Sequence, residues 1–261
     1  DKTQGTLFFR IAEILDKNTV KLLNSNQELT TKNIIIATGS SPYILPDISL
    51  DSNVLNSDGI LGMVDLPESI LIMGGGFIGV EWGCVLANLG TKVTVVEMLS
   101  RILPLEDQEI SLLLQQILVK KGMEFLLETK VSEIKSSRDS VITILETKDG
   151  VKEISTEKVL VAIGRKPNVQ EEWQKIGLDY SAKGLKVDEH MRTNLPNIYA
   201  IGDITGKVML AHVASRQGVI AAENIMGKAS QIDYKAVPNV VFTLPQIASV
   251  GISEQEAQKQ G

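Results

Sequence analysis

The sequence predicts an α/β fold in which helices pack on a mainly parallel sheet. Apolar runs without alternation, such as residues 70–73 and 159–163, are typical of strands buried on both faces. The first run continues through the glycines at 74–76 into a helical pattern, as a strand–turn–helix unit does. Three runs share one ending, two large apolar residues followed by Ala, any residue and Gly, at residues 35–39, 160–164 and 198–202.

The composition narrows the function classes. With 261 residues, of which 43% are hydrophobic, the chain can bury a sizeable core in about two domains. A net charge of −6, interspersed charges and only 4% aromatic residues argue against a nucleic-acid partner. The apolar runs are too short to cross a bilayer, so we expect no membrane partner. The one cysteine, Cys84, cannot form an internal disulfide, which fits a reducing compartment and a cytoplasmic location.

The N-terminal part predicts strands and a connection. Residues 7–14 and 19–23 alternate between apolar and polar side chains, which is typical of strands. Residues 34–39 form an apolar run that predicts a buried strand ending in glycine. The stretch 41–67 is rich in Pro, Ser and Asp, so we expect a connection there and a candidate domain boundary.

The central part predicts two strands and two helices. A strand over residues 70–73 leads into a helix that runs to about Leu89, and another strand covers residues 93–97. A second helix is expected to begin near Glu106 and to end at Gly122. Its apolar stripe consists of Ile110, Leu113, Leu114, Ile117 and Leu118.

The remaining elements follow the same signals. Short alternating segments fill residues 131–154, with Asp149-Gly150 as a hairpin turn. Strands are expected at residues 159–164 and 198–203, separated by a mixed polar segment. A last helix should run from about Met209 to Met226.

The glycine turn at residues 74–79 predicts a dinucleotide site. Gly74 allows the tight turn, Gly76 lacks the Cβ that would block a pyrophosphate, and Gly79 lets helix and strand pack closely. The free N–H groups and the dipole at the helix N-terminus favour negative charge. The alternative is a glycine turn that only packs a helix on a strand.

Glu97 favours NAD over NADP. It lies 23 residues after Gly74, near the spacing expected for the acid that binds the adenosine ribose. A carboxylate there accepts from two free hydroxyls and would repel a 2′-phosphate. The nearest arginine, Arg101, follows four residues later and is interpreted as a surface residue.

The three strand-end glycines suggest more than one ligand. Small residues at the carboxyl end of a strand let a ligand approach, and ligands of open α/β sheets lie at those ends. We therefore expect two nucleotide sites. The alternative is three strands that end in ordinary tight turns.

The order of these motifs resembles the FAD-dependent pyridine nucleotide–disulfide oxidoreductases over essentially the whole chain. The matching segments are residues 37–40, 74–81, 162–168, 198–203 and 209–212. Within that family, the last of these and residues 237–245 are most similar to the dihydrolipoamide dehydrogenases.

The resemblance implies two sets of cofactor-binding residues, with Val131 near the adenine of NAD and Gly164 near its nicotinamide. The NAD set is Gly74, Gly75, Gly76, Phe77, Ile78, Gly79, Val80, Glu81, Glu97, Val131 and Gly164. The FAD set is Gly5, Thr38, Gly39, Ser40, Asp203, Met209, Leu210, Ala211 and His212. Asp203 suits an acceptor for ribityl hydroxyls, and His212 would frame the flavin without transferring protons.

The resemblance also implies a reaction and its partners. Family members of this type pass electrons from the dihydrolipoyl groups of a 2-oxo acid dehydrogenase complex through a redox disulfide and FAD to NAD, as homodimers. This chain lacks the FAD-binding glycine fingerprint, the C-x-x-x-x-C pair and the C-terminal His and Glu, and Gln246 replaces the usual Glu. We expect a central piece of a longer enzyme, with no catalytic residue and no metal ligand of its own.

The implied domains are a Rossmann-like NAD-binding domain inserted in a partial FAD-binding domain of the same type, followed by the start of an α+β dimerisation domain. Residues 1–66 would be the C-terminal part of the first FAD-binding segment, and residues 67–168 the NAD-binding domain. Residues 169–233 would be the second FAD-binding segment, and residues 234–261 would begin the interface domain.

Other functions stay open. A related disulfide reductase or transhydrogenase would share these domains, and residues upstream of Asp1 would decide between them. A non-catalytic NAD-binding module would need neither Asp203 nor three glycine-ended strands.

Four residues also have simpler interpretations. Cys84 lies alone in a helical pattern, which predicts a packing role. His190 lies in a polar stretch and is expected on the surface. Glu81 suits the helix dipole as well as a nicotinamide contact. Phe77 is either a core residue or, as the resemblance implies, a residue over the flavin.

Overall fold

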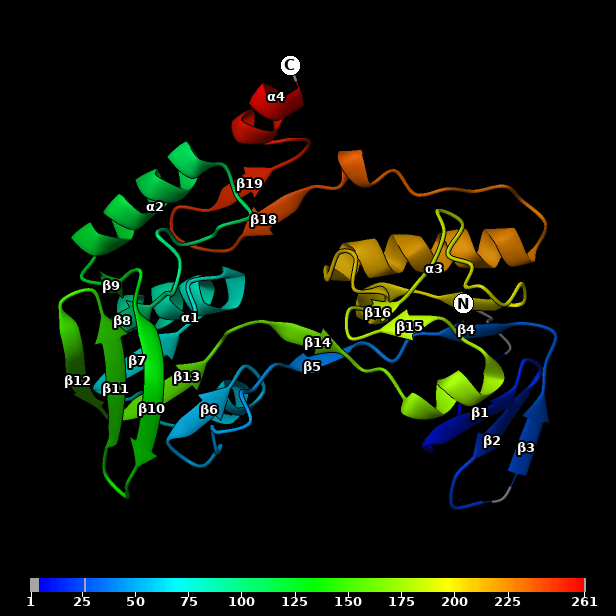
Figure 1. Ribbon diagram of the computed structural model, residues 1–261, viewed down its shortest axis with the longest axis horizontal. Helices are drawn as coiled ribbons and strands as arrows, with labels where there is room; N and C mark the ends of the chain where they lie inside the picture. Colours follow the sequence, from blue (N-terminus) through cyan, green and yellow to red (C-terminus); the bar gives the residue numbers. More distant parts are fainter. Residues whose placement is uncertain (1–4, 26, 261) are drawn as a thin grey trace. The chain divides into compact units, whose positions relative to one another are not determined.

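The computed structural model describes residues 5–25 and 27–260 and confirms the predicted α/β fold (Figure 1). The chain forms two compact units. The first consists of Asp1–Ser41 and Lys166–Tyr234, and the second of Pro42–Arg165 and Lys235–Gly261. Two short strands, β5 (Ser40–Pro42) and β14 (Arg165–Pro167), pair where the chain leaves one unit for the other.

A five-stranded parallel sheet forms the centre of the second unit. The register places Met73, Val96 and Val161 level with one another, so the central strands end at one edge. Glycine turns follow at that edge, which is where ligands of α/β sheets bind. In order across the sheet, the strands are β6 (Val54–Asn56), β13 (Lys158–Val161), β7 (Ser69–Met73), β8 (Lys92–Val96) and β9 (Glu124–Leu126).

Two helices pack on one face of this sheet. Helix α1 (Phe77–Asn88) buries Val80, Cys84 and Leu86 against Ile70 and Ile72 of β7. Helix α2 (Gln108–Lys120) begins two residues later than expected, because the Asp107 side chain caps it by accepting a hydrogen bond from the Glu109 N–H. The short helix η1 is Gly59–Gly62.

Only part of the predicted apolar stripe of α2 is buried in the structure. Leu114 and Leu118 are buried in the core, whereas Ile110 and Leu113 stay half exposed. They line a groove together with residues 245–249 of the C-terminal segment. This part of the stripe therefore faces the C-terminal segment.

An antiparallel sheet contributes the core on the other face. Its strands are β10 (Lys130–Ser136), β11 (Val141–Thr147) and β12 (Gly150–Thr156). The predicted turn at Gly150 joins β11 to β12. Strand β11 buries every second residue, including Val141 and Leu145, against Leu71 and Val159. The five-stranded sheet is therefore buried on both faces, as its unbroken apolar runs predicted.

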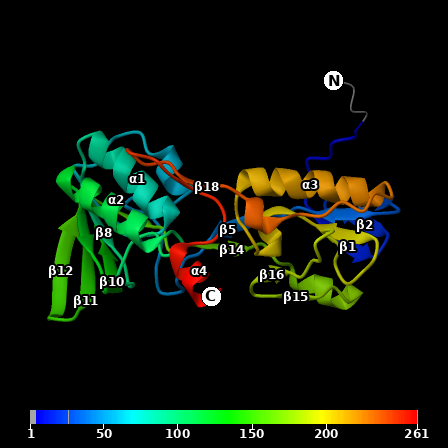
Figure 2. The same ribbon diagram turned by 90° about the horizontal axis from the view of Figure 1, so that it is seen from above.

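The C-terminal segment begins at Tyr234, and its residues from Lys235 onward belong to the second unit; Figure 2 shows β18 and α4 from above. It contains η4 (Tyr234–Ala236), the hairpin β18 (Asn239–Val241) and β19 (Ile247–Ser249), and α4 (Glu254–Gln260). The N–H of Glu254 donates to the Asp107 carboxylate at 3.2 Å.

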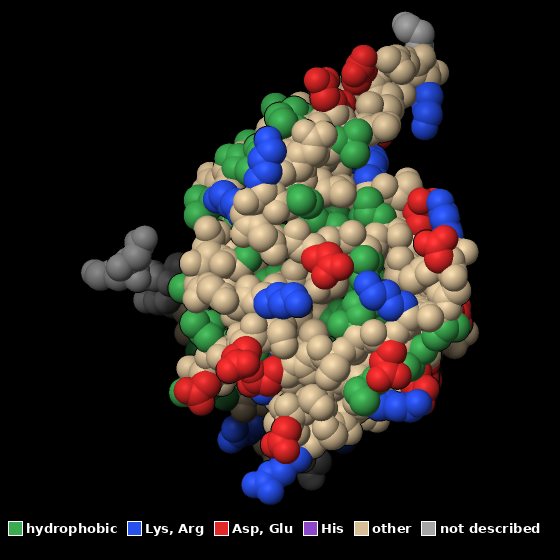
Figure 3. All heavy atoms as spheres, turned by 90° about the vertical axis from the view of Figure 1, so that its left-hand side faces the viewer, with side chains coloured by type: hydrophobic (Ala, Val, Ile, Leu, Met, Phe, Trp, Pro, Cys, Tyr) green, Lys and Arg blue, Asp and Glu red, His purple; other side chains and the backbone are tan. Residues whose placement is uncertain are grey.

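The face of the molecule in Figure 3 carries acidic and basic side chains interspersed, without a large area of one charge sign.

The first unit combines a parallel strand pair with smaller elements. Strands β4 (Ile34–Ile36) and β17 (Ile198–Ala200) are parallel neighbours, and α3 (Ala211–Ile225) packs beside them. An antiparallel sheet consists of β1 (Ala12–Asp16), β2 (Thr19–Leu22) and β3 (Gln27–Thr30). The remaining elements are η2 (Glu171–Ile176), β15 (Tyr180–Ser181), β16 (Gly184–Leu185) and η3 (Gly202–Thr205).

Two expectations were wrong in detail. The strand expected over residues 7–14 begins only at Ala12, and Leu7 and Phe9 are exposed, so the alternation there covers no core. The stretch 41–67 is more than a connection, because it supplies β6 as an edge strand of the parallel sheet. A three-residue strand among polar neighbours leaves too weak a periodicity to predict.

Within residues 5–25 and 27–260, no helix has the length and apolarity that crossing a membrane requires.

Candidate functional site

The glycine turn after β7 has the geometry that its sequence predicts. Gly74 has φ +111°, and a Cβ there would lie 2.4 Å from the Ala162 carbonyl oxygen. A Cβ on Gly79 would lie 2.0 Å from the Gly74 carbonyl oxygen. Neither position has room for a side chain, so α1 can approach β7 closely only with glycine at both.

Gly76 differs from these two glycines because its surroundings are open. No heavy atom lies within 4 Å of a Cβ built there. Gly76 is also the N-cap of α1, and among the described residues no side chain caps this terminus. The first-turn N–H groups are therefore available to an anion, and the helix dipole favours it.

Glu97 follows β8 and lies beside the turn. Its carboxylate accepts a hydrogen bond from the Gly75 N–H at 2.7 Å and another from the Leu99 N–H at 2.8 Å. The two bonds orient the half-buried side chain. Each carboxylate oxygen keeps lone-pair capacity for a further donor such as a hydroxyl.

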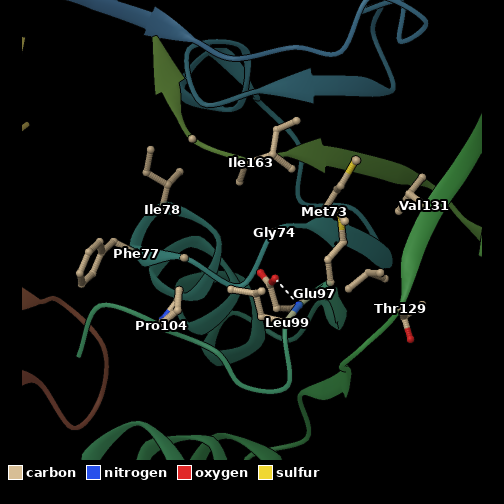
Figure 4. A pocket seen from close by; sticks show the side chains of 15 residues that line it. Met73, Gly74, Phe77, Ile78, Glu97, Leu99, Pro104, Thr129, Val131 and Ile163 are labelled. Carbon is tan, nitrogen blue, oxygen red and sulfur yellow. Dashed lines mark hydrogen bonds between the residues drawn. The ribbon is translucent and has the colours of Figure 1, made fainter. Parts of the chain in front are cut away.

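A cavity of about 480 Å³ opens at this edge of the sheet (Figure 4). Phe77 and Ile78 lie toward one end and Thr129 and Val131 toward the other, with Glu97 between them. The lining residues are Met73, Gly74, Gly76, Phe77, Ile78, Val96, Glu97, Met98, Leu99, Pro104, Thr129, Val131, Ala162, Ile163 and Gly164.

Most of the residues predicted to bind NAD line this cavity, three others lie behind its wall, and Glu81 does not belong to the lining. Gly74, Gly76, Phe77, Ile78, Glu97, Val131 and Gly164 belong to the lining. Gly75, Gly79 and Val80 are buried behind it in the turn and the first turn of α1. Phe77 also packs on the apolar core.

Glu81 has a contact that neither interpretation anticipated. Its carboxylate accepts a hydrogen bond from the Phe242 N–H at 2.8 Å. It therefore fastens the C-terminal segment to α1. A bond between residues 161 positions apart leaves no local signal in the sequence.

Sequence reasoning missed several lining residues. These are Met73, Val96, Met98, Leu99, Pro104, Thr129, Ala162 and Ile163. Some could have been found, because residues next to strand ends of a parallel sheet share one edge. Others, such as Pro104, reach the cavity through the shape of a loop.

The surface interpretation of Arg101 was wrong. The side chain is half buried, and its guanidinium donates to three main-chain carbonyls of the loop that follows it. The acceptors are the oxygens of Leu103, Pro104 and Glu106, at 3.3, 2.7 and 2.9 Å.

The first unit carries a second set of strand ends. Gly39 and Gly202 follow the neighbouring strands β4 and β17 and have φ +68° and +74°. The Ser40 hydroxyl donates to the Asp203 carboxylate at 2.5 Å. Thr38 is held by Asn168, whose side-chain amide donates to the Thr38 carbonyl at 2.9 Å. These polar residues lie together at the carboxyl ends of the two strands.

Gln217 is a buried residue that the sequence did not single out. Its side-chain oxygen accepts from the Gly202 N–H at 2.6 Å, and its amide donates to the Tyr234 hydroxyl at 3.0 Å. Burial raises the pKa of Tyr234, although the bond from Gln217 acts in the opposite direction. The pair fixes the strand end beside Asp203.

The other residues predicted for FAD lie at the start of α3 or near the chain start. Met209 and Leu210 are half buried, Leu210 is the N-cap of α3, and Ala211 and His212 are exposed. Gly5 is exposed, with open space around its α-carbon.

Two side chains of reactive type outside the cavity, Cys84 and His190, make hydrogen bonds to the main chain. Cys84 is buried, and its sulfur accepts from the Leu244 N–H at 3.3 Å. His190 is half buried and bonds the Ser230 carbonyl through Nδ1 at 2.9 Å, so it is not simply solvated. Among the described residues, no group of three His, Cys, Asp or Glu side chains is placed to hold a metal.

Comparisons with known proteins agree with this geometry. The family model of the pyridine nucleotide-disulphide oxidoreductases matches residues 3–218. Dihydrolipoyl dehydrogenase of Geobacillus stearothermophilus is 41% identical over 254 residues, covering 96% of this chain and 54% of that protein. The enzyme of the same name from Chlamydia pneumoniae is 44% identical over 255 residues, covering 95% of this chain and 53% of that protein.

A solved structure has the same fold. The Cu(II) complex of the HOCl-induced flavoprotein disulfide reductase RclA from Escherichia coli has a TM-score of 0.87 and 29% identity, covering 97% of this chain and 58% of that one. This chain thus spans about half the length of the curated relatives it matches. The family match over most of the sequence shows that the chain belongs to the pyridine nucleotide-disulphide oxidoreductase family.

Proposed function

We propose that the cavity beside the glycine turn holds NAD in an extended conformation. The adenine would lie near Val131, the adenosine ribose at Glu97 and the nicotinamide toward Ile78 and Gly164. The pyrophosphate would lie at Gly76, where the open space and the uncapped N-terminus of α1 suit it. The order of Ile78, Glu97 and Val131 along the cavity in Figure 4 supports this direction.

The Glu97 carboxylate carries the proposal, because it is oriented by two backbone N–H groups beside the turn. It can accept from two ribose hydroxyls but would repel a 2′-phosphate. The guanidinium of Arg101 is directed to carbonyls of its own loop. NAD is therefore the proposed partner rather than NADP.

The first unit is proposed to contribute part of an FAD site. Asp203, held by Ser40, offers carboxylate oxygens to ribityl hydroxyls. The rest of the proposed set is Gly5, Thr38, Gly39, Met209, Leu210, Ala211 and His212. In domain terms, residues 67–168 would bind NAD, residues 1–66 and 169–233 would bind FAD, and residues 234–261 would begin a dimerisation domain.

For the longer protein we propose dihydrolipoyl dehydrogenase activity. It would oxidise dihydrolipoyl groups of a 2-oxo acid dehydrogenase complex and pass the electrons through a disulfide and FAD to NAD. The shared identity with proteins named dihydrolipoyl dehydrogenase supports this. We also propose that the longer protein is a homodimer in the cytoplasm.

A related disulfide reductase is the second candidate, since the structural likeness to a flavoprotein disulfide reductase favours it. One assay separates the two. The longer protein, purified with its flavin, is given dihydrolipoamide with NAD, and separately NADH with small disulfides. Rapid NADH formation from dihydrolipoamide supports the first proposal, whereas reduction of the other disulfides without it supports the second.

A further inference from the structure

The loop at residues 101–106, named here the Arg101 loop, connects the dinucleotide cavity with the start of α2. We infer that Arg101 is a positioning residue that shapes the pyrophosphate turn and takes no part in recognising phosphate. The inference rests on the proposed NAD site.

The loop is held by hydrogen bonds to its own carbonyls. Arg101 donates to three of them, and the Ser111 hydroxyl from α2 donates to the Ile102 oxygen at 2.5 Å. Ile102, Leu103 and Ser111 have essentially no exposed surface. Removing the guanidinium takes this donor from the Pro104 and Glu106 carbonyls, whereas the Leu103 oxygen keeps a bond from the Glu106 N–H at 3.0 Å. Carbonyls that lose a donor inside a folded loop are costly, so the loop is expected to loosen.

Leu103 makes the direct contact with the turn. Its N–H donates to the Gly75 oxygen at 2.8 Å. Leu103 has φ +47°, a left-handed conformation that a leucine adopts only when its surroundings impose it. Arg101 binds the carbonyl of this same residue. The guanidinium therefore helps to keep Leu103 in the conformation that reaches Gly75.

The Gly75 residue is thereby held at both of its polar groups. Glu97 accepts from its N–H, and the Leu103 N–H donates to its oxygen. Because a peptide unit is planar, fixing the Gly75 carbonyl also fixes the direction of the Gly76 N–H. Gly76 lines the cavity at the open position proposed for the pyrophosphate. Loss of the Arg101 loop would thus disturb a donor that the ligand needs.

This arrangement predicts an equal effect on both dinucleotides. NADH and NADPH share the pyrophosphate, so Arg101→Ala should weaken both about tenfold, the scale of one lost hydrogen bond to a charged group. The ratio of the two dissociation constants should stay unchanged. Arg101→Lys, which keeps the charge without the planar fork, should weaken both to a smaller degree.

The experiment is calorimetric titration of the 261-residue chain and its variants with NADH and with NADPH. Arg138→Ala removes an exposed arginine from a distant hairpin and serves as the control, expected to bind as the unchanged chain does. Amide hydrogen exchange is measured alongside. The Leu103 amide should lose protection in Arg101→Ala, whereas amides in β7 keep theirs.

Three results would overturn the inference. Unchanged NADH binding in Arg101→Ala would remove the positioning role, and a selective loss of NADPH binding would make Arg101 a phosphate-binding residue. Retained protection at Leu103 would refute the loop contact itself. If Arg101→Ala does not fold, Arg101→Lys gives the same comparison. If the unchanged chain binds no NADH, the proposed function fails, while hydrogen exchange at Leu103 still tests the loop.

Discussion

The carboxylate of Glu97 accepts a hydrogen bond from the N–H of Gly75 at 2.7 Å, which joins the residue after β8 to the turn after β7. The acid proposed to select the ribose therefore also helps to build the turn proposed to bind the pyrophosphate. A change at Glu97 acts on both, so its effects on specificity and on overall affinity must be measured separately.

Gly76 and Gly79 of the turn should respond differently to alanine. Gly79→Ala places a Cβ 2.0 Å from the Gly74 oxygen, so we expect a loss of about 3 kcal/mol in unfolding free energy, the upper end of typical overpacking costs. Gly76→Ala meets no atom and should change stability by no more than about 1 kcal/mol, the scale of an N-cap exchange. It should nevertheless abolish NADH binding. Urea unfolding and titration of the two variants check this, and a stable Gly79→Ala would contradict the packing argument.

Glu81 should act first as an anchor for the C-terminal segment. Glu81→Ala removes the acceptor of the Phe242 N–H, at a cost of about 0.5–1.5 kcal/mol, and should increase hydrogen exchange at Phe242. Glu81→Gln keeps an oxygen acceptor and should restore that protection. If Phe242 exchanges no faster in Glu81→Ala than in the unchanged chain, the hydrogen bond contributes nothing to stability. Glu81 would then have only a role toward the ligand.

Cys84 should matter for stability and not for catalysis. It is buried in α1 and its sulfur accepts from the Leu244 N–H. Cys84→Ser buries a hydroxyl in an apolar core and should cost about 1–3 kcal/mol. Thermal unfolding measures that cost, and turnover of the longer protein should stay largely intact. A hundredfold loss of turnover at unchanged stability would mean that the thiol takes part in the chemistry.

Asp51 predicts a loss of stability in acid. Burial raises its pKa, but hydrogen bonds from the N–H groups of Asn53 and Val54, at 2.7 and 2.8 Å, together with Ser136, hold it below its ordinary value of 3.8. A lowered folded-state pKa stabilises the fold above pH 3.8, and this contribution disappears as the pH falls through the folded value. Asp51→Asn should flatten the pH dependence of unfolding in that range. An unchanged acid transition would show that Asp51 contributes none of it.

The sequence predicts most of the structure where the signal is local. The unbroken run before Gly74 and the glycine at Gly122 correctly indicate a buried strand and a helix end. The three glycines of the shared ending, Gly39, Gly164 and Gly202, all have positive φ, and the two nucleotide sites expected from them stay a prediction.

What the sequence could not predict depends on contacts between distant residues. The bond from Phe242 to Glu81 and the place of Gln217 behind Gly202 follow from packing and leave no periodic pattern. Arg101 was misjudged because a charged residue in a loop is usually solvated. Its partners are carbonyls, which every residue has, so no residue type marks them.

We propose that Glu97 beside the glycine turn selects NAD over NADP. Calorimetric titration of the 261-residue chain with NADH and NADPH tests it most directly, with Glu97→Ala measured in parallel. We predict tighter binding of NADH by at least about tenfold, because NADPH loses a hydrogen bond to a charged acceptor and meets its repulsion. Glu97→Ala should narrow that gap. Equal or tighter binding of NADPH by the unchanged chain would show that Glu97 does not select NAD.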